Sequence, residues 1–261
     1  MIRRRYVDGA WGQVHVTEAG SGPALVLLHQ SPLSGAMFLP ALPMLAAAGF
    51  RVVALDTPGY GASDAPPAPQ SIAAHADALA GVFDALGHDR VHLLGHHTGA
   101  SIAAAFAAQH SLRVDRLVLN GVALLTEAER AFFAGFKFAP LVPRADGGHL
   151  LEAWQQRLKA TPGWTDIAAM HRHVATMLAN PDRYFWAFDA VFAHDLAADI
   201  AAIRAPTMVL TNSGEDLFEA SARAAATRPD WTLKALDGGT HDIVDEQPAA
   251  WAAAVAGFLA R

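Results

Sequence analysis

The stretch of sequence that decides the fold reads Val91-His92-Leu93-Leu94-Gly95-His96-His97-Thr98-Gly99-Ala100-Ser101. An apolar run of strand length comes first, then Gly-x-His-x-Gly, and then small residues that open a helix. Two glycines at this spacing would alone be weak evidence, but a buried strand before them and a buried helix after them make the signal strong. The pattern predicts a sharp turn that presents His97 in front of a helix N-terminus.

Short apolar runs and stretches of helical length alternate on both sides of this turn. Such alternation places helices on both faces of a parallel sheet, so the chain predicts an α/β fold with a mostly parallel, doubly wound sheet. The expected strands are residues 24–28, 52–55, 91–94, 117–119 and 207–210. The expected helices include Ser71 to Leu86, Ser101 to Gln109 and Pro248 to Leu259.

The alternation stops between about Val122 and Ile203, where helical patterns continue without a convincing strand. We therefore expect residues 1–122 and 204–261 to form the core and residues 123–203 to form a helical cap inserted before the last strands. Part of the cap's aromatic set, Trp186 included, should line a cleft between cap and sheet and contact the substrate. The set is Trp154, Trp164, Tyr184, Phe185, Trp186 and Phe188. A second group could form a wall on the hinge side or a dimer contact: Phe132, Phe133, Phe136 and Phe138.

Composition excludes several classes of function. The net charge is −6, and Lys and Arg do not cluster beyond Arg3-Arg4-Arg5, which argues against a nucleic-acid partner. The chain has no cysteine, which excludes disulfides, thiolate metal sites and a Cys nucleophile. Neither a signal pattern nor an unbroken apolar run of about 20 residues is present, so we expect a cytoplasmic protein that does not enter the membrane. A small-molecule substrate is expected, and a homodimer is left open.

The Gly-x-His-x-Gly turn resembles the nucleophile elbow of the α/β-hydrolase superfamily, and the resemblance extends over nearly the whole chain. His29-Gln30-Ser31-Pro32 looks like the oxyanion loop of that family, and residues 54–64 look like its Asp-x-x-Gly-x-Gly-x-Ser segment. The layout with a cap is most similar to the haloalkane dehalogenase, epoxide hydrolase and carbon–carbon bond hydrolase branch. Since the elbow lacks the aspartate that dehalogenases and epoxide hydrolases use, neither activity is carried over.

The resemblance also implies roles for individual residues. The turn after Pro206 would deliver Asp216 as the acid, and Gly238-Gly239-Thr240-His241 would deliver His241 as the base. The backbone N–H groups of Ser31 and Thr98 would be the oxyanion donors, with Gln30 beside the substrate. In the acid turn, Ser213-Gly214-Glu215-Asp216, the family spacing falls on Leu217, so Glu215 competes with Asp216. Asp242 is a further carboxylate next to His241.

The departure from the family is His97, which stands where the family usually carries serine, aspartate or cysteine. Three interpretations are open. His97 could itself attack an acyl group while His241 activates water, or it could act as an acid or base in proton transfer. The site could also bind a ligand without catalysis. A zinc site built from His29, His96, His97 and His241 is disfavoured because their spacing is not a recognised ligand pattern, so we expect no metal and no cofactor. His29 and His96 are expected to be structural hydrogen-bonding groups.

We therefore expect a cofactor-independent hydrolase of a small ester, lactone or related carbonyl compound, with His97 as nucleophile or base. The alternatives are a lyase or isomerase that uses His97 for proton transfer, and a non-catalytic ligand-binding member of the fold.

Overall fold

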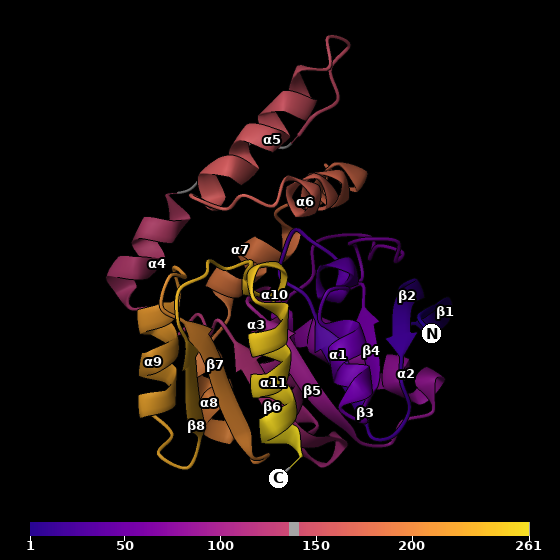
Figure 1. The fold of residues 1–261 in the computed structure, drawn as a ribbon, viewed down its shortest axis with the longest axis vertical. Helices are drawn as coiled ribbons and strands as arrows, with labels where there is room; N and C mark the ends of the chain where they lie inside the picture. The colour runs from indigo at the N-terminus through magenta and orange to yellow at the C-terminus, as the bar shows by residue number, and fades with distance from the viewer. Residues whose placement is uncertain (136–140, 261) are drawn as a thin grey trace.

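Within residues 1–135 and 141–260, the part of the chain that it describes, the computed structural model contains one sheet of eight strands (Figure 1). Its order is β1-β2-β4-β3-β5-β6-β7-β8, with β2 antiparallel to both β1 and β4 and the remaining neighbours parallel. The strands are β1 (Arg3–Gly9), β2 (Gly12–Ala19), β3 (Ala24–Leu28), β4 (Arg51–Leu55), β5 (Val91–His96), β6 (Val114–Asn120), β7 (Thr207–Asn212) and β8 (Thr232–Leu236). The apolar strands β3, β5 and β7 are buried along their whole length, as expected for a parallel sheet covered on both faces.

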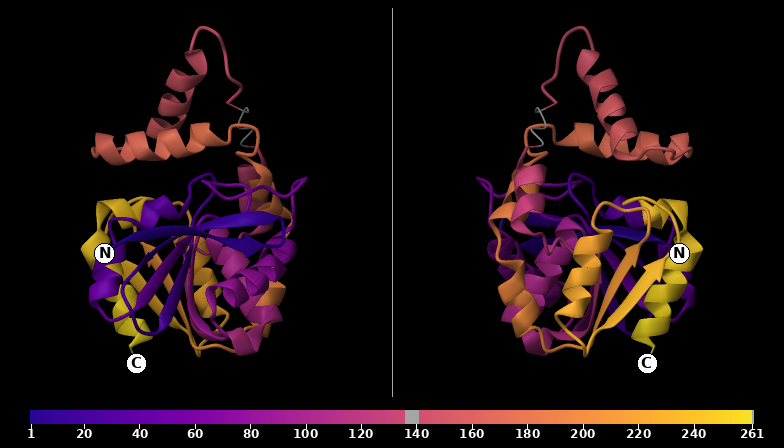
Figure 2. Two further views of the ribbon diagram at one scale, coloured as in Figure 1. Left: turned by 90° about the vertical axis from the view of Figure 1, so that its right-hand side faces the viewer. Right: turned by 90° about the vertical axis from the view of Figure 1, so that its left-hand side faces the viewer.

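Helices cover both faces of this sheet (Figures 1 and 2). They are α1 (Leu42–Ala47), α2 (Ile72–Leu86), α3 (Thr98–Gln109), α4 (Glu127–Ala134), α5 (Gly148–Ala160), α6 (Ile167–Ala179), α7 (Trp186–Ala193), α8 (Leu196–Ala202), α9 (Phe218–Ala226), α10 (Ile243–Glu246) and α11 (Pro248–Leu259), with short 3-10 turns η1 (Gly35–Phe38) and η2 (Ser111–Arg113). One buried cluster joins α2, α3 and α8 to one face, and a second joins α1, α10 and α11 to the other.

The helices between β6 and β7 fall into two groups. Figure 2 shows α6 lying across the core above the sheet, with α5 extending away from it. By contrast, α8 packs on α3, and its Leu196 and Ile200 belong to the buried cluster of the core. We use the word cap for α5 and α6 from here on.

The expected fold class is confirmed, and so are the element types at its centre. Each of the five expected strands lies within an observed one. Helix α2 begins after Ser71, whose side chain accepts from the N–H of Ala74, and ends at Gly87 in the left-handed conformation. That combination of caps is what the sequence indicated. Helix α3 begins three residues earlier than expected, directly after His97.

Candidate active site

His97 occupies a strained turn between β5 and α3. Its φ is 51° and its ψ is −108°, and among the described residues it alone combines a side chain with positive φ. Gly95 and Gly99 flank the turn because a Cβ on either would overlap backbone atoms, of Gly99 and Leu28 respectively. A strained non-glycine residue in front of a helix N-terminus is typical of a functional position. The sharp turn that the sequence predicted at His97 is therefore present.

The His97 ring is held by a buried carboxylate. Its Nε2 lies 2.8 Å from Oε2 of Glu215, whose side chain is fully enclosed. The other oxygen, Oε1, accepts a hydrogen bond from the hydroxyl of Thr211 on β7. Since a carboxylate accepts, Nε2 carries the proton and the lone pair of the imidazole lies on Nδ1. In the described part of the chain, Nδ1 has no hydrogen-bond partner and is not one of the enclosed unpaired atoms, so it faces accessible space.

Gly121, directly after β6, has no side chain and so leaves space for the His97 ring and the Glu215 carboxylate. Its φ is +68°, and a Cβ built on it would overlap both the His97 ring and the Glu215 carboxylate. Gly121 was not among the site residues expected from the sequence. A lone Gly after a strand is a common turn signal, so nothing in the sequence marked it as part of the site.

Asp216, the acid that the resemblance implied, is exposed. No hydrogen bond or ion pair joins it to His241 among the residues described, so the expected pairing of these two is corrected. The reason is the shorter acid turn: Glu215 rather than Asp216 points inward from the end of β7. Glu215, the competing carboxylate, contacts His97 instead of His241.

His241 lies beside the elbow in a different environment. Its ring centre is 6.0 Å from that of His97. Burial lowers the pKa of His241 to about 3; the charge of Asp242 opposes this shift, and the charge of Arg157 adds to it. His241 is therefore neutral near pH 7. The structure thus forms two separate groups, His97 with Glu215 and His241 with Arg157 and Asp242.

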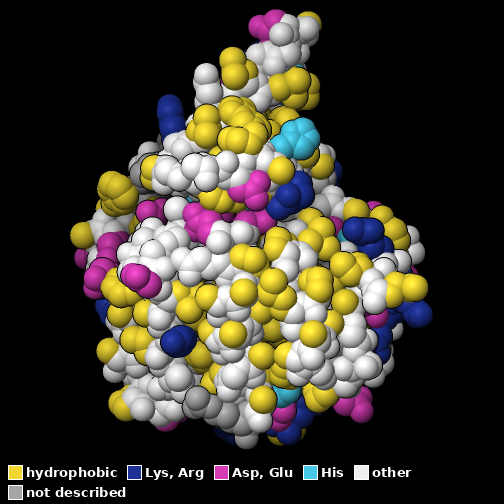
Figure 3. Space-filling view, viewed as in Figure 1, with side chains coloured by type: hydrophobic (Ala, Val, Ile, Leu, Met, Phe, Trp, Pro, Cys, Tyr) yellow, Lys and Arg dark blue, Asp and Glu magenta, His cyan; other side chains and the backbone are white. Residues whose placement is uncertain are grey.

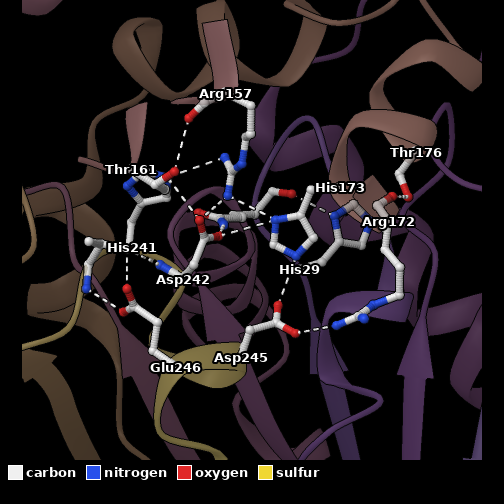
Figure 4. A network of polar contacts seen from close by, with 12 residues as sticks. His29, Arg157, Thr161, Arg172, His173, Thr176, His241, Asp242, Asp245 and Glu246 are labelled. Carbon is white, nitrogen blue, oxygen red and sulfur yellow. Dashed lines mark hydrogen bonds and ion pairs between the residues drawn. The ribbon is translucent and has the colours of Figure 1, made fainter. Parts of the chain in front are cut away.

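A polar cluster joins the cap to the core around His241 (Figure 4). Arg157 of α5, only 5% exposed, pairs with the buried Asp242. His173 of α6 lies with Nδ1 2.9 Å from Nη2 of Arg157 and Nε2 2.8 Å from Oδ2 of Asp245. Burial alone would raise the pKa of Asp242, but the charge and the hydrogen bond of Arg157 hold it below its usual value. Neither Arg157 nor His173 was expected in the site from the sequence.

The residues expected to bind an oxyanion lie between these two groups. The N–H of Ser31 donates to the hydroxyl of Thr98 at 3.4 Å, and Thr98 opens α3, where first-turn N–H groups have no intrahelical acceptor. The amide of Gln30 donates to Asp242 at 3.0 Å. His29 donates from Nδ1 to the carbonyl of Gln30 and accepts at Nε2 from the N–H of Thr57. His29 thus holds its loop, as expected.

His96 points into the core, as expected, but not as a hydrogen-bonding group. Both of its ring nitrogens are enclosed and, within the described ranges, lack a partner. Burial holds the pKa of His96 well below its ordinary value, and its ring meets that of His97 at an edge, 4.7 Å between centres. The His96 ring is therefore neutral and buried, and it packs edge-on against the His97 ring.

Trp186 lies at the start of α7 and lines a groove of about 280 Å³ with residues from the loop before α2. That lining does not include His97, Glu215 or His241. Phe133 packs against Phe192 of α7, while Phe136 and Phe138 lie outside the described residues. Contact between the expected aromatic set, Trp186 included, and a substrate therefore stays a prediction.

In the described ranges, no set of three or more His, Cys, Asp or Glu side chains is arranged to hold a metal ion. The same residues contain no helix long and apolar enough to cross a membrane.

The comparisons agree with this architecture. The family model of the alpha/beta hydrolase fold matches residues 23–239. Epoxide hydrolase 2 of Siraitia grosvenorii is 41% identical over 107 residues, which cover 40% of this chain and 34% of that protein. A 2-hydroxy-6-oxononadienedioate/2-hydroxy-6-oxononatrienedioate hydrolase of Pseudomonas putida is 30% identical, covering 88% of this chain and 85% of the relative. The enol-lactonase of Burkholderia xenovorans LB400 superposes with a TM-score of 0.81 at 22% identity, covering 98% of this chain and 100% of that one. The chain therefore belongs to the alpha/beta hydrolase fold family.

Proposed function

We propose that this protein is a cofactor-independent hydrolase of a small ester, lactone or related carbonyl compound, and that His97 is its general base. The observation that carries the proposal is the 2.8 Å contact between Nε2 of His97 and the buried carboxylate of Glu215. The named hydrolases among its relatives support the reaction class.

In the proposed reaction, Nδ1 of His97 takes a proton from a water molecule that attacks the carbonyl carbon. Glu215 holds the opposite N–H and stabilises the imidazolium that forms, as the acid of a catalytic triad does. The N–H groups of Ser31 and Thr98 would stabilise the oxyanion. The carbonyl re-forms as the bond to the leaving oxygen breaks, and the imidazolium returns its proton to that oxygen.

The pairing of His97 with Glu215 favours base catalysis over nucleophilic attack by His97. A carboxylate on Nε2–H stabilises a protonated ring, which is the product of proton abstraction. The carboxylate would stabilise an acylated His97 less. A neutral acyl-imidazole carries no proton on Nε2, so it has no hydrogen bond to donate to Glu215. Trapping an acyl adduct on His97 by mass spectrometry after a rapid quench would overturn the base assignment and support the nucleophile.

A panel of small esters and lactones tests the reaction class. We expect the wild type to hydrolyse members of the panel, His97→Gln to lose activity, and His171→Gln, an exposed cap histidine, to retain it. Products formed in ¹⁸O-labelled water must carry the label. Turnover without the label would instead identify a lyase or isomerase, and ligand-induced thermal stabilisation without turnover would identify a binding protein.

We propose in addition a cytoplasmic location, which cell fractionation tests. The homodimer left open by the sequence is decided by light scattering at several protein concentrations.

A further inference from the structure

Arg157 reaches from α5 into the cluster around His241 (Figure 4). Its Nη1 lies 3.3 Å from Nε2 of His241, and its Nη2 contacts both His173 and Asp242. An arginine buried to 5% exposure is uncommon and requires a partner, which Asp242 supplies. Neither the family match nor the relatives assign a role to this residue.

The chemistry of guanidinium allows only one arrangement of protons in this cluster. Arginine stays protonated and has no acceptor, so it donates in each contact. Nε2 of His241 and Nδ1 of His173 must then both accept. His173 consequently carries its proton on Nε2, where Oδ2 of Asp245 accepts it at 2.8 Å. By the same reasoning, His241 carries its proton on Nδ1.

We propose that Arg157 is a positioning residue that fixes His241 in the neutral Nδ1–H form and engages its Nε2 lone pair, so that proton abstraction falls to His97. The assignment of His97 as the base rests on the proposed function, whereas the effect of Arg157 on the tautomer of His241 does not. One arginine on the cap would thus decide which of two histidines, 6.0 Å apart, is available as a base.

Four groups act on the proton affinity of His241. Asp242 of its own turn favours the protonated ring, while Arg157 of α5, His97 of the elbow and His173 of α6 oppose it. Of the three opposing groups, Arg157 alone is a permanent cation. Removing Arg157 while Asp242 stays charged therefore shifts the balance toward protonation, and it also frees Nε2.

Nitrogen NMR of ¹⁵N-histidine-labelled protein tests the proposal without a substrate. In the wild type, we expect His241 to show a protonated Nδ1 and an unprotonated Nε2, with no titration between pH 5 and 8. In Arg157→Gln, we expect its pKa to rise by about one unit or more, as when an uncompensated carboxylate lies nearby. Lys159→Gln, on an exposed position of the same helix, should leave the His241 signals unchanged.

Arg157→Gln also leaves Asp242 buried without its cation, which can prevent folding. The double variant Arg157→Gln/Asp242→Asn removes both charges and keeps His241. In it we expect a mixture of the two neutral tautomers in place of the single Nδ1–H form. Where the panel provides a substrate, the pH–rate profile of Arg157→Gln should gain a second ionisation that disappears on addition of His241→Gln.

A wild-type His241 protonated on Nε2, or one that titrates normally between pH 5 and 8, overturns the proposal. So does an unchanged single tautomer in the folded double variant. The two failures can be distinguished. If the proposed function is wrong, the protein is inactive toward every ester and lactone of the panel, but the NMR signals of His241 are still as expected.

Discussion

Two adjacent carboxylates of the acid turn, Glu215 and Asp216, differ in their burial and in their contacts. Glu215 is enclosed and bonded to His97 and Thr211, whereas Asp216 is exposed. The resemblance implied Asp216, and only the spacing of the turn raised Glu215 as a competitor. The sequence could locate the turn, but a single missing residue changes which carboxylate points inward. That direction depends on the path of the backbone, which no residue type in the turn reveals.

Gly121→Ala tests whether the room beside His97 matters. The added Cβ would displace the His97 ring and the Glu215 carboxylate, so we expect activity to fall by about 10²-fold or more, the scale of a lost positioned base. Gly87→Ala is the matched control. Gly87 also has positive φ, at +76°, but a Cβ there meets nothing within 4 Å.

Both variants should lose about 1–2 kcal/mol in the free energy of unfolding, because an L residue in the left-handed region is strained. Gly121→Ala should lose more than Gly87→Ala, because its Cβ also overlaps His97 and Glu215. Only Gly121→Ala should also lose activity. Equal activity in the two variants, measured by steady-state kinetics beside urea denaturation, would contradict the assigned role of Gly121.

At the scale of elements, α5 shows where sequence periodicity fails. The helix buries Ala153 and Arg157 and exposes Leu150, Leu151 and Leu158 at 51%, 60% and 42%. An amphipathic helix normally turns its leucines inward, so the pattern gave no reason to expect Arg157 in the site. The helices of the core were predictable because their buried faces are apolar and capped. The helical segments of the cap were predicted as well, but the inward position of Arg157 on α5 was not.

The ion pair of Arg172 with Asp245 and the hydrogen bond from His173 to Asp245 should control how firmly the cap lies on the core. Asp245 accepts from both Arg172 and His173 of α6, and acidic side chains gather where the cap meets the core (Figure 3). We expect Asp245→Asn to speed hydrogen exchange in α6 while β5 keeps its protection, because local opening needs less free energy than global unfolding. Asp182→Asn, whose side chain is 69% exposed, serves as the control. Uniformly faster exchange in α6 and β5 would contradict this view.

For the whole molecule, the sequence predicted the alternation of the five central strands with helices, the inserted helices and the elbow. These follow from the alternation of apolar runs and from local turn chemistry. The limits of the cap at residues 123 and 203 stay a prediction, although α8 packs with the core. Strands β1, β2 and β8 are not among the five expected strands, because none of the three forms an apolar run. Long-range pairs such as His97 with Glu215 were beyond reach, since 118 positions separate them.

Buried neutral histidines should make the stability of the whole protein depend on acid pH. Burial lowers the pKa of His75, which packs against Trp11, to about 4. As the pH falls below about 6.5, His75 becomes protonated in the unfolded chain, whereas in the folded protein it stays neutral down to about pH 4. The free energy of unfolding therefore decreases between about pH 6.5 and pH 4. His75→Leu should remove part of this loss, on the order of 3 kcal/mol at its fullest extent. Urea denaturation between pH 4 and 7 measures it. A slope equal to that of the wild type would contradict the assignment, and His171→Gln should show that slope.

The central claim is that the buried Glu215 and His97 form the working pair of this enzyme. The most direct measurement compares kcat of Glu215→Gln and Asp216→Asn on the best substrate of the ester and lactone panel. Both changes neutralise a carboxylate in the same turn, but only one carboxylate contacts His97. The account predicts a fall of about 10²–10⁴-fold for Glu215→Gln and a change of less than about twofold for Asp216→Asn. A large fall for Asp216→Asn with little effect of Glu215→Gln would contradict it.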